Sequence, residues 1–235
     1  MRNVRTSDLE KSIRYSFQEK DILLQALTHS TFAHENKSRK AICDNERLEF
    51  LGDGLLDFVV AEQLYLLCND QNEGYLSKTR ALVVCETSLA EKALEISLGD
   101  YLLLGKGELQ TGGKEKPSNL ANAMEAVFAA VFLDGGFENA KAVILHLMFP
   151  VIQQAIGGSI VFDYKSRILE LVQSQKDHTL SFSIIEEEGP VHERQYTAGL
   201  YLDGNMISTG NGLSKKLAEQ AAAKSGFERA RQILH

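Results

Sequence analysis

The sequence has no tryptophan, three prolines and three cysteines among its 235 residues. So few prolines exclude a long proline-rich linker. The cysteines, Cys43, Cys68 and Cys85, are odd in number and show no C-x-x-C spacing, so neither a zinc site nor a disulfide framework is indicated. We therefore expect buried or inert thiols in a reducing cytoplasm.

Long apolar runs are also missing. The longest, Ala126–Leu133, is far too short to span a bilayer, so we expect no membrane partner. Residues 1–14 are polar and charged, which is not the pattern of a secretory signal.

A surplus of basic charge, the usual footprint of a nucleic-acid-binding protein, is absent as well. The net charge is −7 at pH 7. From Ala155 onward, nine Lys and Arg stand against ten Asp and Glu, a net charge of −1. If nucleic acid binds this chain, local clusters of basic residues must bind it, because the overall charge does not attract a polyanion.

Helical periodicity is present from Asp8 to about Ile156. Apolar residues recur three and four positions apart, as in Leu48–Val59, and no convincing alternating strand occurs. This half predicts an all-α domain over residues 1–156. Polar breaks separate its helices at Glu35–Lys40, Cys68–Gly74 and Gly105–Pro117.

The pattern changes after a short Gly-Gly-Ser stretch. We expect a linker over residues 157–161 and a small α+β domain over residues 162–235, with the order α-β-β-β-α. Asp203–Asn205 has the composition of a hairpin turn. The predicted elements are a helix at Asp163–Gln175, strands at Ser181–Glu187, Gln195–Leu202 and Met206–Gly212, and a helix at Ser214–Leu234.

Acidic residues form a stripe on one helix of the first domain. Glu49 and Asp53 are four positions apart and share a helix face, which Glu46 and Asp57 extend. Apolar residues surround the stripe, and Glu125 is a lone carboxylate among small apolar residues. Partly buried carboxylates need a counter-charge, and a hard divalent cation is a natural one. Solvated helix faces or salt bridges are the common alternative for residues of these types.

The string Glu46–Asp53, with the sequence ERLEFLGD, distinguishes these explanations. It resembles the signature of the ribonuclease III family, and the resemblance extends over nearly the whole chain. Further matching segments are Ala26–Ser30, Glu73–Gly74 with Leu76–Lys78, Gly99–Glu108 and Phe132–Gly136.

The resemblance implies an Mg²⁺-dependent endonuclease that cuts double-stranded RNA, with Mn²⁺ as a substitute for Mg²⁺. It assigns Glu49, Asp53, Asn122 and Glu125 as metal ligands, with Asp53 and Glu125 catalytic. The metal would activate water for attack on the phosphate, leaving 5′-phosphate and 3′-hydroxyl ends. Expected substrates are precursor ribosomal RNA and structured messenger RNA.

Three further side chains of this domain receive lesser roles. Glu46 and Glu73 match acidic positions of the family and are expected to support the site at most. His29 is expected to be structural, because the implied mechanism needs no histidine. A homodimer is expected, because two carboxylate clusters related by a twofold axis can cut both strands of a duplex.

Asn122 departs from the family pattern, in which most members carry Asp. An amide oxygen can still ligate Mg²⁺ or hold one of its waters, but it brings no negative charge. The alternative is a double-stranded RNA binder with a disabled nuclease site. A structural, ribosome-associated protein built on this fold is a second rival.

Lysines begin the final predicted helix. Ser214 is a good N-cap, and Lys215 and Lys216 occupy the first turn, where cations oppose the helix dipole. A phosphate bound at this helix end would offset the unfavourable interaction between the lysines and the helix dipole. The alternative is a lysine pair that simply faces solvent. The segment Gly210–Ala223, together with Phe162–Ser166 and Gly189–His192, resembles a double-stranded RNA-binding domain.

This second resemblance implies how the domain contacts RNA. The helix start formed by Ser214, Lys215 and Lys216 would bind RNA phosphates. Ser166, Glu170 and His192 would contact two successive minor grooves. Leu169 stands where the family often has a polar residue, which is expected to weaken or reshape one minor-groove contact.

Overall fold

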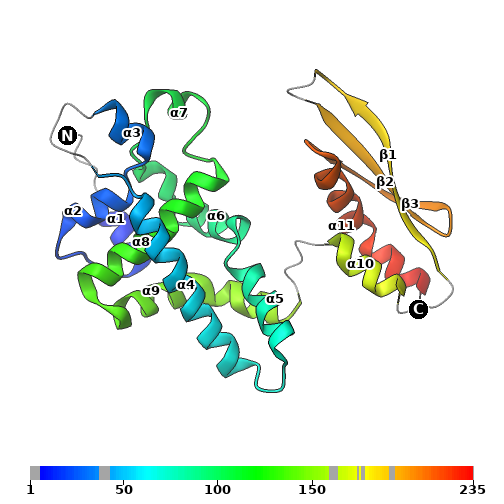
Figure 1. The fold of residues 1–235 in the computed structure, drawn as a ribbon, viewed down its shortest axis with the longest axis horizontal. Coiled ribbons are helices and arrows are strands. Elements are labelled where there is room, and N and C mark those ends of the chain that lie inside the picture. Colours follow the sequence, from blue (N-terminus) through cyan, green and yellow to red (C-terminus); the bar gives the residue numbers. More distant parts are fainter. Residues whose placement is uncertain are drawn as a thin grey trace. The chain divides into compact units, whose positions relative to one another are not determined.

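The computed structural model describes residues 6–36, 43–158, 164–173, 175, 178–190 and 194–234. The chain divides into two compact units, residues 1–160 and 161–235 (Figure 1). Residues 159–163, which include most of the predicted linker, lie outside the described residues, so the linker stays a prediction.

The first unit is built from helices, as the periodicity predicts. Helix α8 lies at its centre and packs against α2, α4, α6 and α9. Phe128 and its neighbours on α8 are fully buried and anchor one apolar core. The helices are α1 (Ser7–Ile13), α2 (Lys20–Ala26), α3 (Ser30–Glu35), α4 (Glu46–Leu67), α5 (Glu73–Val83), α6 (Glu86–Glu95), the 3₁₀ helix η1 (Leu98–Tyr101), α7 (Lys106–Gln110), α8 (Pro117–Gly135) and α9 (Phe137–Ile156).

Two of the predicted breaks are partly wrong. Glu73 and Gly74 begin α5, and the segment Gly105–Pro117 contains the short helix α7. The first backbone N–H of α7, that of Lys106, donates to the Glu35 carboxylate at 2.9 and 3.1 Å. This cap comes from α3, so the local sequence around α7 does not reveal it.

The FLDGG segment, Phe132–Gly136 at the end of α8, is hydrogen-bonded to the loop that follows α1. The Asp134 carboxylate accepts hydrogen bonds from the Tyr15 hydroxyl at 2.6 Å and from the backbone N–H groups of Gln18 and Glu19 at 2.9 and 2.8 Å. A Cβ at Gly135 would lie 2.3 Å from the Tyr15 hydroxyl oxygen. This part of the family resemblance therefore has a structural cause.

The second unit has the predicted order α-β-β-β-α. Its strands form one antiparallel sheet in the order β1-β2-β3, and α11 packs against β2 and β3 while also contacting α10 (Figure 1). The elements are α10 (Tyr164–Gln173), β1 (Leu180–Glu188), β2 (Gln195–Leu202), β3 (Asn205–Gly212) and α11 (Lys215–Leu234).

Backbone geometry confirms the predicted hairpin between β2 and β3. Asp203 and Gly204 both have positive φ, 52° and 79°, which suits a two-residue hairpin turn. Glycine is also required on β3, because a Cβ at Gly210 would lie 2.0 Å from the backbone N of Ala222. The alanine-rich face of α11 therefore lies directly on the strand.

The cysteines are all free, as predicted, but they are not all buried. Cys68 is buried and Cys85 is half-buried, whereas Cys43 is exposed, because it lies in the polar segment before α4 rather than on a core face. Among the described residues, no helix is both long and apolar enough to cross a membrane.

Candidate active site and RNA-binding surface

Helices α4 and α8 cross in backbone contact at Gly52. A Cβ at Gly52 would lie 1.9 Å from the carbonyl oxygen of Glu125, so only glycine fits there. On α4, Glu49 and Asp53 flank this point. The contact therefore joins two acidic segments about seventy residues apart in the sequence.

Helix α8 is partly exposed at only two positions between Leu120 and Val131. These are Asn122 and Glu125, and every other residue in that stretch is buried. Because three residues are less than one helical turn, both side chains lie on one face. The structure thus brings the four predicted ligands to one crossing, while their role as ligands stays a prediction.

The carboxylates at the crossing repel one another. Burial raises the pKa of Glu125 to about 7, and the charges of Asp53, Glu49 and Asp57 add to the shift. Of these, Asp57 has a cationic partner, Arg80, at 3.7 Å. A carboxylate with so high a pKa lacks a counter-charge.

Asn122 is part of this network through Glu49. Burial and the charge of Glu46 raise the pKa of Glu49, whereas a hydrogen bond from the Asn122 side chain lowers it. The amide N–H₂ donates and the carboxylate accepts, so Asn122 holds Glu49 in place without adding a negative charge.

The donor set suits a hard divalent cation. Three carboxylates and one amide supply only oxygen ligands, and a cation would offset their repulsion. Among the described residues, no three His, Cys, Asp or Glu side chains are arranged to hold an ion as they stand. The carboxylates are close enough to shift each other's pKa but do not converge on one point, so cation binding requires them to reorient.

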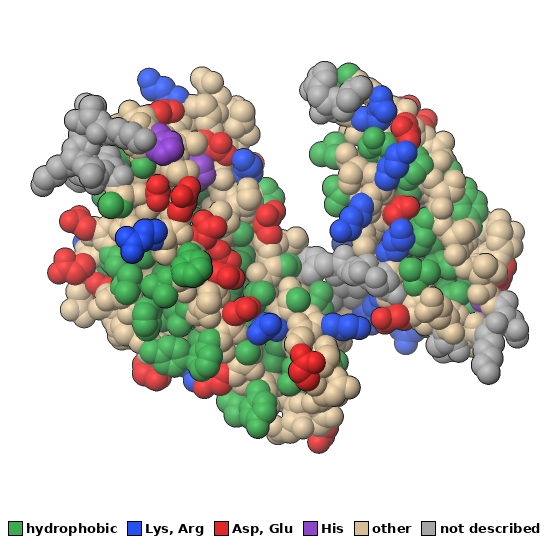
Figure 2. Space-filling view, viewed as in Figure 1, with side chains coloured by type: hydrophobic (Ala, Val, Ile, Leu, Met, Phe, Trp, Pro, Cys, Tyr) green, Lys and Arg blue, Asp and Glu red, His purple; other side chains and the backbone are tan. Residues whose placement is uncertain are grey.

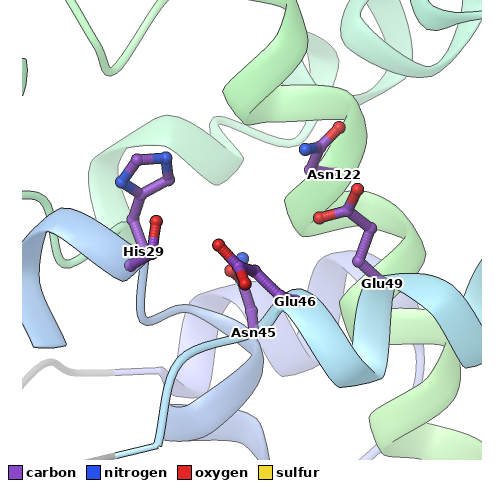
Figure 3. Close-up of a pocket in the computed structure, with 6 residues that line it drawn as sticks. His29, Asn45, Glu46, Glu49 and Asn122 are labelled. Atoms are coloured by element: carbon purple, nitrogen blue, oxygen red, sulfur yellow. The ribbon is translucent and has the colours of Figure 1, made fainter.

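A polar pocket of about 310 Å³ adjoins the carboxylates (Figure 3). Asp53 and Glu125 do not line it, so it extends from the crossing toward the start of α3. Its lining residues are His29, Ser30, Asn45, Glu46, Glu49 and Asn122.

Several lining residues lie outside the predicted site. Glu46, expected only as support, is exposed at the start of α4 and lines the pocket. Asn45 is buried, and its side chain donates to the Ala26 carbonyl at 3.2 Å, which fixes the start of α4. His29 caps α3, as a structural role requires, but it also lines the pocket.

Glu73 lies apart from this arrangement. It begins α5, where its carboxylate accepts a hydrogen bond from the Ser77 hydroxyl at 2.7 Å. It does not line the pocket, and it is not among the groups that shift the pKa of Glu49 or Glu125.

In the second unit, the start of α11 has the predicted N-cap, and its two lysines differ in their surroundings. The Ser214 hydroxyl accepts from the Leu217 N–H at 3.3 Å, as an N-cap does. The Lys215 ammonium lies 2.8 Å from the Glu187 carboxylate and 5.6 Å from the Tyr196 ring centroid. Lys216 is exposed and has no ion pair within the described part of the chain.

The predicted minor-groove residues are only partly described. Glu170 is exposed on α10, beside the half-buried Leu169, and lines a second pocket of about 320 Å³. Ser166 lies on α10, but its side chain falls outside the described residues, as does the whole of His192. Their RNA contacts stay predictions.

Two family models match the chain. The model described as Ribonuclease-III-like matches residues 19–152, and the model described as double-stranded RNA binding motif matches residues 164–229. Ribonuclease 3 of Caldanaerobacter subterraneus subsp. tengcongensis is 46% identical over 221 residues, covering 94% of this chain and 96% of that protein.

The chain belongs to the ribonuclease III family. Ribonuclease 3 of Clostridium perfringens is 41% identical and covers 99% of this chain and 97% of that protein. The nuclease domain of ribonuclease III from Campylobacter jejuni is 44% identical, with a TM-score of 0.57 over 62% of this chain and 97% of that one. The family resemblance of the ERLEFLGD string is thereby confirmed.

Proposed function

We propose that this chain is an Mg²⁺-dependent endoribonuclease that hydrolyses double-stranded RNA to 5′-phosphate and 3′-hydroxyl ends. The observation that carries the metal site is the uncompensated Glu125 carboxylate, held against Glu49 and Asp53 where α4 meets α8. Members of this family depend on a metal ion, and Mn²⁺ would substitute for Mg²⁺.

In this proposal, Glu49, Asp53, Asn122 and Glu125 hold the metal, and Asp53 and Glu125 are the catalytic pair. Mg²⁺, when bound, polarises the scissile phosphate and activates water. Gly52 sets the spacing of the two helices, and the Asn122 amide orients the Glu49 carboxylate. The packing thus brings these side chains to one crossing before RNA arrives, and the carboxylates reorient when the metal binds.

Asn122 does not argue for a disabled enzyme. Three carboxylates remain at the crossing, and Mg²⁺ commonly binds proteins through one or two carboxylates together with waters and phosphate oxygens. The relatives that match nearly the whole chain are named ribonucleases. A double-stranded RNA binder with an inactive site, or a purely structural protein, therefore finds no support.

A homodimer would place two such sites on one duplex. Phe50, Phe58 and Tyr65 lie along one side of α4 and are 83%, 57% and 71% exposed. Figure 2 shows apolar side chains gathered beside the carboxylates on the helical unit. Large exposed apolar patches mark interaction sites. The Campylobacter jejuni structure is described as having a region involved in dimer formation, which supports the same assembly here.

The second unit would bind the duplex. Its match to the double-stranded RNA binding motif and the lysines at the start of α11 support this role. Precursor ribosomal RNA and structured messenger RNA in the cytoplasm are the substrates we infer from the family resemblance.

Cleavage of a long perfect RNA duplex tests the proposal. The parent should cut in Mg²⁺ and stop when EDTA is added. Glu125→Gln keeps the side-chain shape but loses the charge, so the rate should fall on the order of 100-fold or more while duplex binding persists. Glu91→Gln on the exposed face of α6 is the matched control and should cleave normally. Undiminished cleavage by Glu125→Gln would place the metal elsewhere.

A further inference from the structure

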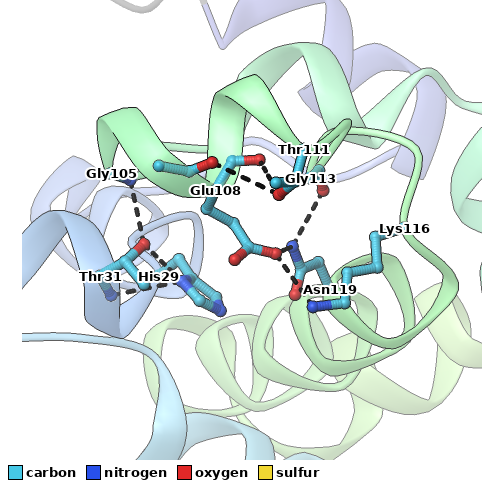
Figure 4. A network of polar contacts seen from close by, with 9 residues as sticks. His29, Thr31, Gly105, Glu108, Thr111, Gly113, Lys116 and Asn119 are labelled. Atoms are coloured by element: carbon cyan, nitrogen blue, oxygen red, sulfur yellow. Dashed lines mark hydrogen bonds and ion pairs between the residues drawn. The ribbon is translucent and has the colours of Figure 1, made fainter. Parts of the chain in front are cut away.

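A chain of hydrogen bonds fixes the His29 ring beside the candidate active site. His29 Nδ1 accepts from the Thr31 backbone N–H at 3.3 Å and lies 2.8 Å from the Thr31 hydroxyl. That hydroxyl oxygen accepts from the Gly105 N–H at 3.0 Å, which leaves its own hydrogen to point at Nδ1 (Figure 4).

These contacts determine which ring nitrogen carries the proton. A nitrogen that accepts from both an N–H and an O–H must offer its lone pair, so the neutral His29 ring carries its hydrogen on Nε2. The α3 cap thereby turns His29 into a hydrogen-bond donor at Nε2.

That donor is not used within the described part of the chain. Glu108 lies close enough to the ring for the two charges to interact, but its Oε1 accepts from the Asn119 amide at 2.8 Å and the Lys116 ammonium at 3.1 Å, and it makes no hydrogen bond to His29 (Figure 4). His29 Nε2 makes no hydrogen bond with any described residue, and His29 lines the 310 Å³ pocket. A fixed donor therefore faces a polar space beside the carboxylates.

The rest of the lining limits what the pocket can accept. Ser30, Asn45 and Asn122 are neutral, while Glu46 and Glu49 are carboxylates that would repel a phosphate (Figure 3). A ribose hydroxyl both donates and accepts, so it can bond to a histidine N–H and a carboxylate at once. The 2′-hydroxyl distinguishes RNA from DNA.

We propose that this pocket receives the ribose of a nucleotide next to the scissile phosphate, and that His29 Nε2–H donates to its 2′-hydroxyl while Glu46 accepts from it. The inference rests on the proposed nuclease function. It gives the helical unit its own selection for RNA over DNA, separate from binding by the second unit.

Two variants separate the cap of α3 from the donor at Nε2. His29→Asn places an amide oxygen near the position of Nδ1, where it can still cap α3, but has nothing at Nε2. His29→Gln places an amide N–H near Nε2 but loses the acceptor for Thr31 N–H. A merely structural histidine would tolerate Asn better than Gln, whereas a donor would tolerate Gln better than Asn.

The experiment combines these variants with substrates that lack one hydroxyl. Single-turnover cleavage in Mg²⁺ is measured on an all-ribose hairpin duplex with one cut site and on copies with a single 2′-deoxy nucleotide at each flanking position. The parent should lose about 3- to 10-fold at one position, the value of one hydrogen bond. His29→Asn should cut the all-ribose substrate more slowly and lose less at that position than the parent does, because only the bond to Glu46 remains, and His29→Gln should keep more of the sensitivity than His29→Asn.

The outcomes distinguish this inference from the proposed function. Failure of the parent to cut the all-ribose duplex defeats the nuclease proposal itself. A parent that cuts with no sensitive position, or a His29→Asn variant that retains full sensitivity, overturns the ribose pocket. If His29→Asn does not fold, Glu46→Ala at the exposed start of α4 replaces it in the same comparison. Undiminished sensitivity in that variant likewise overturns the proposal.

Discussion

The α4–α8 crossing and the start of α11 differ in whether their charged side chains have partners of opposite charge. At the crossing, helix packing forces Glu49, Asp53 and Glu125 together, and the pKa of Glu125 rises to about 7. At the start of α11, the exposed Lys215 is paired with Glu187 of β1 on the protein surface. The carboxylates of the first region repel one another, whereas in the second region one of the two lysines is already paired with a carboxylate.

The largest predicted effect comes from separating the helices at the crossing. Gly52→Ala places a Cβ against the Glu125 carbonyl, so α4 and α8 must move apart. We expect a loss of at least about 1–3 kcal/mol in the free energy of unfolding and loss of cleavage. Urea unfolding and the duplex cleavage assay measure both.

Gly107→Ala in α7 is the matched control, because nothing lies within 4 Å of its Cβ position. It should be neutral or stabilise by up to about 1 kcal/mol. Equal losses of stability and cleavage in Gly52→Ala and Gly107→Ala would show that close contact between α4 and α8 does not explain the need for glycine at position 52.

A smaller effect is expected from restoring charge on α8. Asn122→Asp adds a fourth carboxylate, so cleavage should require several-fold less Mg²⁺ than in the parent, which itself is active. Cleavage rates across an Mg²⁺ titration measure the requirement. A parent that is inactive at every Mg²⁺ concentration, with full activity in the Asp variant, would contradict this account.

The pKa of Glu125 also predicts how stability depends on pH without metal. Between about pH 4.5 and 7 the folded protein holds a proton on Glu125 that the unfolded chain releases. Stability from this group is therefore lost as the pH rises through that window. In EDTA, the Tm of the parent should fall relative to the Tm of Glu125→Gln as the pH is raised from 5 to 8. Parallel Tm curves for the two proteins would refute a raised pKa.

The smallest effect concerns the two lysines. Lys216 has no ion pair within the described residues, so Lys216→Ala should weaken duplex binding and flatten the plot of log affinity against log salt. Lys215→Ala should flatten that slope less, because Glu187 already offsets the charge of Lys215. The double variant should show the largest change. If the two single variants match, the ion pair does not influence RNA binding.

Much of the fold and of the acidic cluster could be predicted from the sequence. Helical spacing places Glu49 with Asp53, and Asn122 with Glu125, on shared faces, and the ERLEFLGD string joined these pairs through the family resemblance. The order α-β-β-β-α and the Asp203–Gly204 turn followed from local composition. Apart from the joining of the two pairs, which only the family resemblance supplied, each of these features depends on residues close together in the chain.

Features that depend on distant contacts could not be predicted. The need for glycine at position 52 arises from the Glu125 backbone on another helix. The partner of Lys215 lies on β1, and α7 is capped by Glu35 from α3. The pocket beside His29 combines residues of three segments. Spacing within one helix contains no information about such contacts.

Direct measurement of cation binding tests the central claim that the carboxylates at the α4–α8 crossing lack a counter-charge and take a divalent cation. Mn²⁺ binding, followed by calorimetry or electron paramagnetic resonance without RNA, is compared in the parent, Glu125→Gln and the control Glu91→Gln. We expect a site that Glu125→Gln loses or weakens at least about 10-fold and that Glu91→Gln keeps. Equal stoichiometry and affinity in all three proteins would contradict it.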